Sequence, residues 1–560
     1  REGRPSVFHP YRLTAVCAVL LMGCSQLVFL KQPSVPTPAG PSSLELGPAF
    51  GPEPIGPIDT IADWATYNRT LEGNRGSPLA EIDTSNVAQL RPVCTFDLGE
   101  RAAFETGPVV VGGTMYLTTA QGTYAIDAAS CRLRWKHTYK YRPHPDFVLK
   151  VNRGVAYANG RLFRGSNDGR IYALDARTGK TLWNVVAADV ARGETFPAAP
   201  LAWGGLVFMG NAGGDNFGVT GRMMAFDAET GGRVWSFGLT PESGEASRTW
   251  PPSTEVIPKG GGATWTSYAL DTLAGSVFLA TGNAAPDFLD EVRPGTNRYT
   301  YSVVELDARL GTLKSSSQLL KRDNHDWDMA AAPSLITTAG GQRLIVEGGK
   351  DGYLYAIDRK TGAVRYRTAV TQINNVDAPL TSQGTRFCPG VNGGIEWNGP
   401  TYSRQSDALF VNAIDWCTTV RVAPAAKLQG KKGLPWTGSS QLRHPFGVQD
   451  SSWAGWLTAI DAQSGAIRWR YRSPTPLVSG ITSTAGGLVF TGDLRGDFMA
   501  FDARSGAIRW HYGTGQPIGG GVVTYRVAGK QLVAVAAGMH APVTWKLKSP
   551  PAKVVVFGLP

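Results

Sequence analysis

The sequence predicts an all-β protein that folds as an eight-bladed β-propeller built from tryptophan-containing repeats. Three observations predict this fold: one segment recurs along most of the chain, each copy alternates apolar and polar residues, and turn-forming residues separate the copies. The chain has 560 residues, including 68 Gly, 37 Pro and 16 Trp, and 18% of its residues are charged. Because this composition is rich in turn-forming and aromatic residues, we expect few helices.

Each copy of the repeat predicts a β-hairpin. An alternating apolar strand leads to a turn that in most copies reads Asp-x-x-Thr/Ser-Gly, and a second strand follows, which in most copies ends in an aromatic residue. The Asp side chain can accept hydrogen bonds from the backbone ahead of it, and Gly readily takes a positive φ. Seven copies are recognisable, and their turns begin at Asp127, Asp175, Asp227, Asp307, Asp358, Asp461 and Asp502.

The spacing of the copies predicts the number of blades. Copies lie roughly 40 to 50 residues apart, or about twice that where we expect one copy to have decayed, a period typical of propeller blades. A preceding unit such as residues 160–166 supplies two further strands, giving about four strands per blade. Seven copies and two double-length gaps, one of which we expect to hold a long insertion, predict eight blades. A final strand near residues 554–557 would close the ring against N-terminal strands, and the aromatic residues would pack between blades.

The N-terminal segment predicts export. Residues 1–32 contain Arg residues followed by the apolar run 13–22, whose length fits the core of a signal peptide. The run ends before Cys24 in a segment that resembles a bacterial lipoprotein processing site, and an uncleaved anchor is the alternative. Residues 33–57, rich in Pro, Gly and Ser, are predicted to be a flexible tether before a propeller at 58–560. We therefore expect a periplasmic protein, either free or tethered to a membrane through its N-terminus.

The cysteines outside the leader predict two disulfide bonds. They form an even set in an oxidising compartment, and we pair Cys94 with Cys131 and Cys388 with Cys417. Each pair brackets one or two strands and their connecting turn. Their spacings do not resemble zinc sites, and this sequence contains no C-x-x-C-H motif for covalent haem.

The formal net charge of +11 does not indicate a nucleic-acid partner. Lys and Arg are scattered along the chain without a basic run, and no nucleic-acid-reading motif is present.

The repeat resembles the tryptophan-docking motif of the PQQ-dependent (quinoprotein) alcohol dehydrogenase family, whose members bind pyrroloquinoline quinone (PQQ) on the axis of an eight-bladed propeller. Outer-membrane assembly lipoproteins carry similar repeats, so the repeat alone also fits a non-catalytic propeller. Five further segments resemble site motifs of the family and occur in the family's order. These segments are residues 151–156, 260–265, 280–286, 326–328 and 350–352.

This resemblance implies a role for one residue in each segment. Arg153 and Lys350 would contact the quinone, and Trp265 would form the floor beneath it. Asn283 would bind a metal ion, and Asp328 would be both a metal ligand and the catalytic base. These residue types suit the chemistry, because a planar quinone with three carboxylates needs an aromatic surface and cations, and a hard cation needs oxygen ligands.

The sequence departs from the family pattern at three places. Where the family has a Glu metal ligand, alignment of this segment gives either Asp215 or Asn216. Ala330 stands where lanthanide-using relatives have an Asp, so the resemblance implies calcium. Residues 147 and 148 are not the adjacent cysteines of the well-known alcohol dehydrogenases of the family.

The sequence thus predicts a periplasmic PQQ- and calcium-dependent dehydrogenase that oxidises an alcohol by hydride transfer to the quinone. Asp328 would accept the hydroxyl proton, with Asp326 as the local alternative. Electrons would pass to a separate acceptor, cytochrome c or a membrane quinone. Two alternatives stay open: a sugar or polyol quinoprotein dehydrogenase, and a non-catalytic binding propeller of the outer-membrane assembly type.

Overall fold

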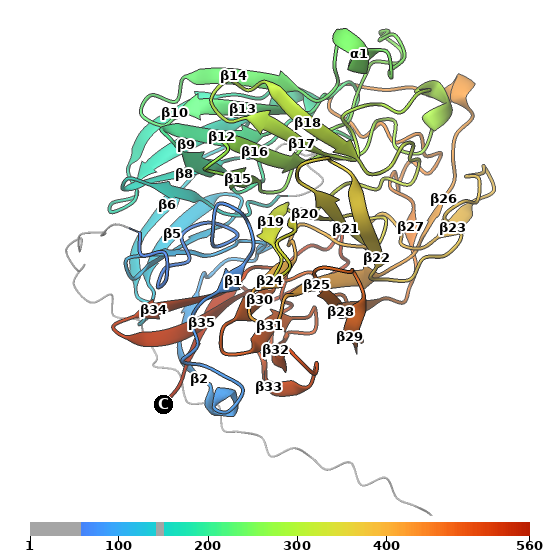
Figure 1. Cartoon of the computed structure of the whole chain (residues 1–560). Helices are drawn as coiled ribbons and strands as arrows, with labels where there is room; N and C mark the ends of the chain where they lie inside the picture. Colours follow the sequence, from blue (N-terminus) through green and yellow to red (C-terminus); the bar gives the residue numbers. More distant parts are fainter. Residues whose placement is uncertain (1–57, 142–149) are drawn as a thin grey trace, which may run out of the picture. The chain divides into compact units, whose positions relative to one another are not determined.

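The computed structural model describes residues 58–141 and 150–560, which form an all-β structure (Figure 1). The predicted leader and tether, and residues 147 and 148, lie outside the described residues. The described chain forms eight sheets of four or five strands and one sheet of three strands. Figure 1 shows the larger sheets following one another around the molecule in chain order, from blue to red, which is the arrangement of a propeller.

The first five blades each contain four antiparallel strands that follow one another in the chain. In each of these sheets the first strand is more buried than the fourth, so each sheet runs from the core to the surface. These strands are β3 (Val109–Val111), β4 (Thr114–Thr118), β5 (Gly122–Asp127) and β6 (Leu133–Thr138); β7 (Ala156–Ala158), β8 (Arg161–Gly165), β9 (Arg170–Asp175) and β10 (Thr181–Val186); β11 (Leu201–Trp203), β12 (Leu206–Gly210), β13 (Arg222–Asp227) and β14 (Arg233–Gly238); β15 (Ala269–Asp271), β16 (Ser276–Ala280), β17 (Ser302–Asp307) and β18 (Leu313–Gln318); and β19 (Ser334–Thr337), β20 (Arg343–Gly348), β21 (Tyr353–Asp358) and β22 (Val364–Ala369).

The last three blades contain strands from distant parts of the chain. The sixth comprises β24 (Thr401–Ser403), β25 (Ala408–Asp415), β28 (Ala454–Asp461) and β29 (Ile467–Ser473). The seventh comprises β30 (Thr482–Thr484), β31 (Leu488–Gly492), β32 (Asp497–Asp502) and β33 (Ile508–Gly513), with β1 (Gly76–Ser77) parallel to β30. The eighth comprises β34 (Val522–Val527), β35 (Lys530–Ala537), β36 (Lys553–Gly558) and β2 (Arg91–Asp97).

Helices in the described chain are few and short. They are α1 (Gly244–Ser247) and the 3-10 helices η1 (Val87–Gln89), η2 (Val190–Arg192), η3 (Asp290–Val292) and η4 (Ala425–Lys427). None of the helices among the described residues has the length and hydrophobicity needed to cross a bilayer.

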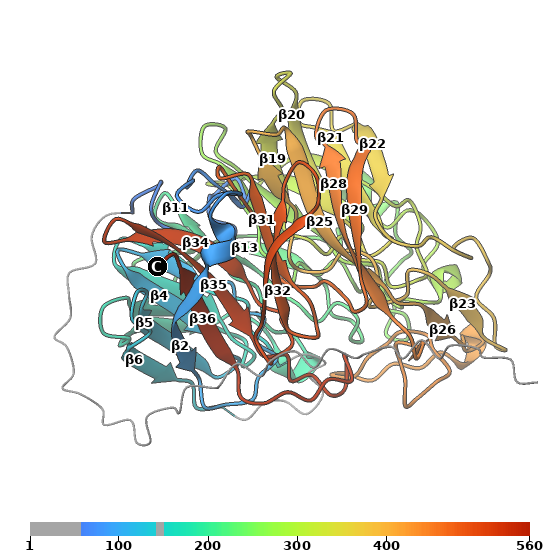
Figure 2. The same ribbon diagram turned by 90° about the horizontal axis from the view of Figure 1, so that it is seen from below.

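An N-terminal strand closes the ring. β2 pairs antiparallel with β36 at the outer edge of the last blade (Figure 2), which confirms the prediction for residues 554–557. The predicted disulfide between Cys94 and Cys131 is present and joins β2 to the turn after β5. Cys131 has a φ of 59° and stands where the other copies of the repeat have Gly. The Cys94–Cys131 disulfide therefore joins the ring-closing blade to the first blade. At the equivalent position, most other blades pack an aromatic residue against the Gly of the next blade's turn.

The aromatic residues of the repeats pack between blades, as the sequence predicts. Trp183 Nε1 donates a 3.0 Å hydrogen bond to the carbonyl oxygen of Ala228 in the next blade. The indole ring lies so close to Gly231 that a Cβ there would come within 2.7 Å of it. Trp469 makes the equivalent bond, also of 3.0 Å, to the blade that follows it. Each Trp thus ties one blade to the next.

The interpretation of the double-length gaps is wrong in one respect. Neither gap holds an additional blade with a decayed repeat: the gap before Asp307 holds long connections, and the gap before Asp461 holds an insertion. The eighth blade is instead the ring-closing one. Its two outer strands, β36 and β2, come from opposite ends of the propeller, so no hairpin turn joins them and no copy of the repeat is needed there.

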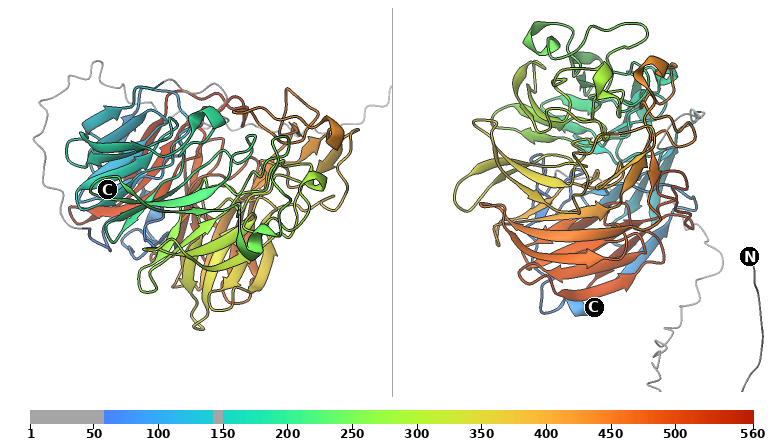
Figure 3. Two further views of the ribbon diagram at one scale, coloured as in Figure 1. Left: turned by 90° about the horizontal axis from the view of Figure 1, so that it is seen from above. Right: turned by 90° about the vertical axis from the view of Figure 1, so that its right-hand side faces the viewer.

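The predicted insertion lies in the sixth blade and covers part of the site face. It contains β26 (Thr418–Val420) and β27 (Val448–Gln449), which form the three-stranded sheet with β23 (Thr385–Phe387). The predicted disulfide between Cys388 and Cys417 joins its base. Figure 3 shows the orange segment after β26 beside the green loops, and Phe288 N donates a 2.8 Å hydrogen bond to the Thr437 oxygen.

Candidate active site

The candidate site lies on one face of the propeller. In these antiparallel blades, connections between the second and third strands emerge on the same face as connections from one blade to the next. All the site residues that the sequence predicts lie on such connections: Arg153, Asp215, Asn216, Trp265, Asn283, Asp328 and Lys350.

A cavity of about 490 Å³ brings most of these residues together. This volume is within the usual range for small-molecule sites. Six predicted residues line the cavity, together with Asp326 and Glu396; the six are Arg153, Asp215, Trp265, Asn283, Asp328 and Lys350. Asn216 is buried and is not among the lining residues, and its Nδ2 lies 3.4 Å from the Gly193 oxygen. Of the two alternatives for the Glu position, the structure places Asp215 in the cavity.

Asp328 is held by donors from three loops. Its Oδ2 lies 2.8 Å from Lys350 Nζ and accepts a 3.2 Å hydrogen bond from Trp265 Nε1. Its Oδ1 accepts a 2.9 Å bond from the backbone N–H of Asn283. A Cβ on Gly282 would lie 2.6 Å from Oδ1, so the carboxylate needs a glycine there. These donors fix the direction of the carboxylate.

Two cations flank the indole of Trp265, which is partly exposed to the cavity. The Arg153 guanidinium carbon lies 4.9 Å from the ring centroid, and Lys350 Nζ lies 5.5 Å from it. Arg153 also forms a 2.6 Å ion pair with Glu105, and both side chains are almost fully buried. Although burial disfavours the charge of Lys350, Asp328 and Asp326 raise its pKa well above the ordinary value. An aromatic surface between two cations suits a planar anion.

A group of carboxylates lies beside Asp328. One oxygen from each of Asp215, Asp287 and Asp326 lies within 4.8 Å of the others. Burial, together with the charge of Asp328, raises the pKa of Asp215 to about 6. Burial and the neighbouring carboxylates raise the pKa values of Asp287 and Asp326 well above the ordinary value. Such a group is costly to ionise unless a cation joins it.

Sequence reasoning missed two acidic residues of this site. Asp287 directly follows the motif segment 280–286. Its position four residues after Asn283, a predicted metal ligand, was the available signal. Glu396 lies next to Trp397 in the loop before β24, outside every motif, and no sequence signal indicated it. Burial raises the pKa of Glu396 to about 7, although Lys350 lowers it in part.

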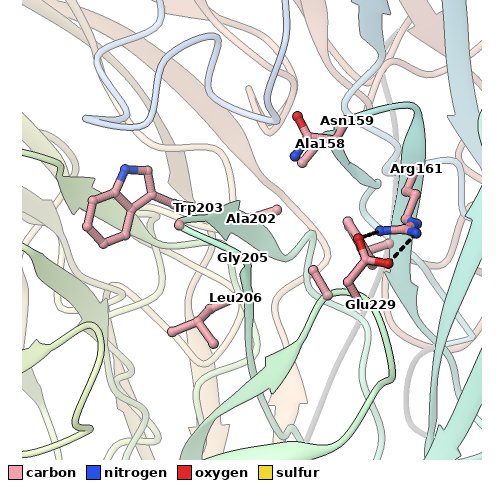
Figure 4. A pocket seen from close by; sticks show the side chains of 11 residues that line it. Ala158, Asn159, Arg161, Ala202, Trp203, Gly205, Leu206 and Glu229 are labelled. Atoms are coloured by element: carbon pink, nitrogen blue, oxygen red, sulfur yellow. Dashed lines mark hydrogen bonds and ion pairs between the residues drawn. The ribbon is translucent and has the colours of Figure 1, made fainter.

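A second, smaller cavity of about 200 Å³ lies on the opposite face, between the turns of the second and third blades. Figure 4 shows Arg161 and Glu229 paired on one side and Trp203 on the other. Its lining residues include one ion pair and no group of acidic or metal-binding side chains. The first cavity is therefore the candidate active site.

Comparison with known proteins gives the same assignment. The PQQ family model described as glucose/ethanol/alcohol dehydrogenase, beta-propeller domain, matches residues 64–369 and 363–533. A lanthanide-dependent methanol dehydrogenase from Methylacidiphilum fumariolicum is 30% identical over 78% of this chain and 78% of its own length. The dehydrogenase subunit of an alcohol dehydrogenase (quinone) from Gluconacetobacter polyoxogenes is 32% identical over 86% of this chain and 72% of its own length.

A solved structure supports the comparison. A europium-containing methanol dehydrogenase superposes with a TM-score of 0.80 at 28% identity, covering 89% of this chain and 98% of the other. The family model spans most of the described propeller, and the cavity contains residues from all five predicted site segments. The chain therefore belongs to the family of PQQ-dependent glucose, ethanol and alcohol dehydrogenases.

Proposed function

We propose that this protein is a periplasmic dehydrogenase that binds PQQ and a hard metal cation and oxidises an alcohol. The observation that carries the proposal is the arrangement around Trp265: an exposed aromatic face flanked by Arg153 and Lys350, with Asp328 at its edge. Arg153 Nε, a buried donor, has no hydrogen-bond partner among the described residues. The site thus offers both the surface and the polar groups that a tricarboxylate quinone requires.

Each side chain has a defined task in the reaction. Bound PQQ would supply the hydride acceptor, and the cation would polarise it as a Lewis acid. Trp265 would support the flat face, while Arg153 and Lys350 balance negative charge. Asp328 would take the hydroxyl proton of the alcohol on a carboxylate oxygen. The contacts of Asp328 with Lys350 Nζ and Trp265 Nε1 hold its carboxylate in place beside the cavity.

Three residues are our candidates for holding the cation: Asp215, Asn283 and Asp328. They line one cavity and offer the oxygen atoms that hard cations prefer. The absence of Asp at position 330 argued for calcium, whereas the relatives named above include a lanthanide-dependent and a europium-containing enzyme.

The substrate class and the route of the electrons complete the proposal. The relatives named above are alcohol dehydrogenases, and a cavity of about 490 Å³ has room for a small alcohol beside the cofactor. Electrons leave to a separate acceptor, cytochrome c or a membrane quinone. The signal-peptide pattern in residues 1–32 supports a periplasmic location, with the protein either free or tethered to a membrane.

The proposal is tested with the apo-protein and its Asp328→Asn variant. Calorimetric titration with PQQ, with and without added metal, is followed by dye reduction over a panel of alcohols. We expect metal-dependent PQQ binding by both proteins, and a fall in dye reduction by about 10²-fold or more in the variant, because the general base is lost. Failure of the native protein to bind PQQ under every condition would contradict the proposal.

A further inference from the structure

A buried cation that does not line the cavity, Arg293, joins two loops of the site. It belongs to the loop after β16, residues 281–301. Its Nε donates a 2.9 Å hydrogen bond to the Pro286 oxygen, and its Nη2 donates a 3.1 Å bond to the backbone oxygen of Asp287. Its Nη1 donates a 3.1 Å bond to the side-chain oxygen of Asn297. A further 2.6 Å bond, from Nη2 to the backbone oxygen of Asp323, reaches the loop after β18, residues 319–333.

The acceptors around Arg293 are unusual for a buried cation. All four are neutral oxygens, and the side chain is part of a residue that is only 2% exposed. Burying a charged group costs free energy, and pairing with a carboxylate is the usual compensation. Because a guanidinium presents its donors in a rigid planar fork, it can instead hold oxygens of separate loops at set positions.

Both loops continue from Arg293 to the proposed site residues. Asp287 Oδ1 accepts a 2.9 Å hydrogen bond from Asn283 Nδ2 in the first loop. In the second loop, Asp323 Oδ2 accepts a 3.1 Å bond from the backbone N–H of Trp327, which directly precedes Asp328. The two loops meet where the backbone N–H of Asn283 donates its 2.9 Å bond to Asp328 Oδ1. The bonds of Arg293 thus support this contact from behind.

A tyrosine makes a second bridge between the same loops. Tyr301 is fully buried, and its hydroxyl accepts a 3.0 Å hydrogen bond from the backbone N–H of Ala284. The same hydroxyl donates a 3.4 Å bond to the backbone oxygen of Asp323, which Arg293 also binds. Two buried side chains therefore converge on one carbonyl of the loop that carries the proposed base.

We propose that Arg293 is a positioning residue, which holds Asp328 in place relative to Asn283 by bonding together the loops that carry them. A displacement of about 1 Å in a reacting group can cost about 10²-fold in rate, so such a link matters for catalysis. A cation that only balanced nearby charge would work equally well as Lys, whereas bonds to two loops require the fork of Arg. The inference rests on the proposed function, in which Asp328 is the base.

The test compares Arg293→Lys with Arg164→Lys. Both substitutions keep the positive charge and remove the planar fork. Arg164 is the matched control, because it is fully buried, bonds the backbone oxygens of Thr119, Ala120 and Gly122, and does not line the cavity. Hydrogen exchange of peptides 281–289 and 319–328 is measured in the apo-protein. Steady-state kcat and KM for an alcohol are measured after loading with PQQ and cation.

We expect Arg293→Lys to speed exchange in both peptides by about ten-fold or more, because bonds that hold the loops are lost. Its kcat should fall by about ten-fold or more. KM should stay within about two-fold of the native value, since the displaced group acts in the transition state. Arg164→Lys should leave the exchange of both peptides, kcat and KM unchanged.

Tyr301→Phe is the second variant, and it keeps the ring while removing the hydroxyl bridge. We expect the same changes as in Arg293→Lys, about half as large on a logarithmic scale because fewer bonds are lost. Thermal melting shows whether each variant folds. Should Arg293→Lys fail to fold, native exchange and native kcat in Tyr301→Phe would overturn the inference.

Two results with folded Arg293→Lys would also overturn it: native exchange rates in both peptides, or a kcat equal to that of Arg164→Lys. The outcome is separable from that of the proposed function. Alcohol oxidation by the native protein with an unchanged kcat in Arg293→Lys would refute the positioning role alone. Faster exchange confined to the two peptides, in a protein that does not bind PQQ, would refute the dehydrogenase and leave the link between the loops standing.

Discussion

Asp328 shows how single residues are placed by distant parts of this chain. Its carboxylate accepts hydrogen bonds from the indole N–H of Trp265 and the backbone N–H of Asn283 and pairs with the ammonium of Lys350, and these groups lie on three different loops. No local pattern could predict those contacts, because they depend on how the blades are arranged around the axis. The resemblance to the family motif therefore identified Asp328, whereas its hydrogen-bond partners depend on the fold.

The close approach of Gly282 to Asp328 gives a prediction at this scale. Gly282→Ala would place a Cβ 2.6 Å from Oδ1 and displace the carboxylate. We expect kcat to fall by about ten-fold or more, since small displacements of a catalytic group are costly. Gly513→Ala is the control, because a Cβ there has no atom within 4 Å. Equal steady-state rates for the two variants would contradict this account of the site.

Glu396 predicts a pH dependence of stability in the apo-protein. Burial raises its pKa to about 7 in the folded state, above its value in the unfolded chain. The folded protein therefore binds the proton more tightly, so this stabilisation is present below about pH 4.5 and is lost as the pH rises through about 7.

Glu396→Gln keeps a neutral side chain and should remove this effect. Relative to that variant, the native apo-protein should lose up to a few kcal/mol of unfolding free energy between pH 5 and pH 8. Denaturant unfolding at both pH values measures the difference. The exposed Glu255→Gln variant is the control, and a pH-independent difference for Glu396→Gln would contradict the raised pKa.

Among the elements, the hairpins were predictable and the long connections were not. The Asp turn is encoded locally: in the turn at Asp175, Oδ1 accepts bonds from the backbone N–H groups two and three residues ahead, at 3.1 and 2.8 Å. Gap length carries no such local signal, so it does not distinguish a decayed copy of the repeat from long connections such as those before Asp307. Asp287 lies in those loops, so its approach to Asp215 and Asp326 depends on tertiary structure.

The docking of Trp469 gives a prediction for the contact between two blades. Trp469→Phe keeps an aromatic ring and removes the 3.0 Å bond from Nε1 to the Ala503 oxygen, leaving a buried carbonyl without that donor. We expect a loss of about 1 kcal/mol of unfolding free energy or somewhat more. Thermal melting measures it, and an unchanged melting temperature would show that the bond does not stabilise the interface.

On the scale of the whole molecule, closure of the ring is the feature that depends on both ends of the propeller. Closure by a final strand near residues 554–557 was predictable from the sequence, whereas the fold determines that β2 is the N-terminal strand that pairs with β36. The disulfide between Cys94 and Cys131 was predicted from spacing, whereas its position at the closure could not be, because it depends on which blade receives β2.

Removing that disulfide should weaken the whole propeller. The two cysteines are 37 residues apart, and chain-entropy reasoning for a loop of this length predicts a loss of about 4 kcal/mol in Cys94→Ser/Cys131→Ser. Unfolding in denaturant measures the loss. A double variant of Cys388 and Cys417 serves as the comparison, because that bond joins the loop before β24 to the base of the insertion and not to the ring closure. An unchanged midpoint for the first variant would show that β2 closes the ring without covalent help.

The most direct test of the central claim is a single-turnover measurement on protein loaded with PQQ and cation. The absorbance of bound PQQ is followed after an alcohol is added without any electron acceptor. We predict stoichiometric reduction in the native protein and about 10²-fold slower reduction in Asp328→Asn, because the base that takes the hydroxyl proton is absent. An unchanged PQQ spectrum in the native protein across the alcohol panel, or equal rates in both proteins, would contradict the account.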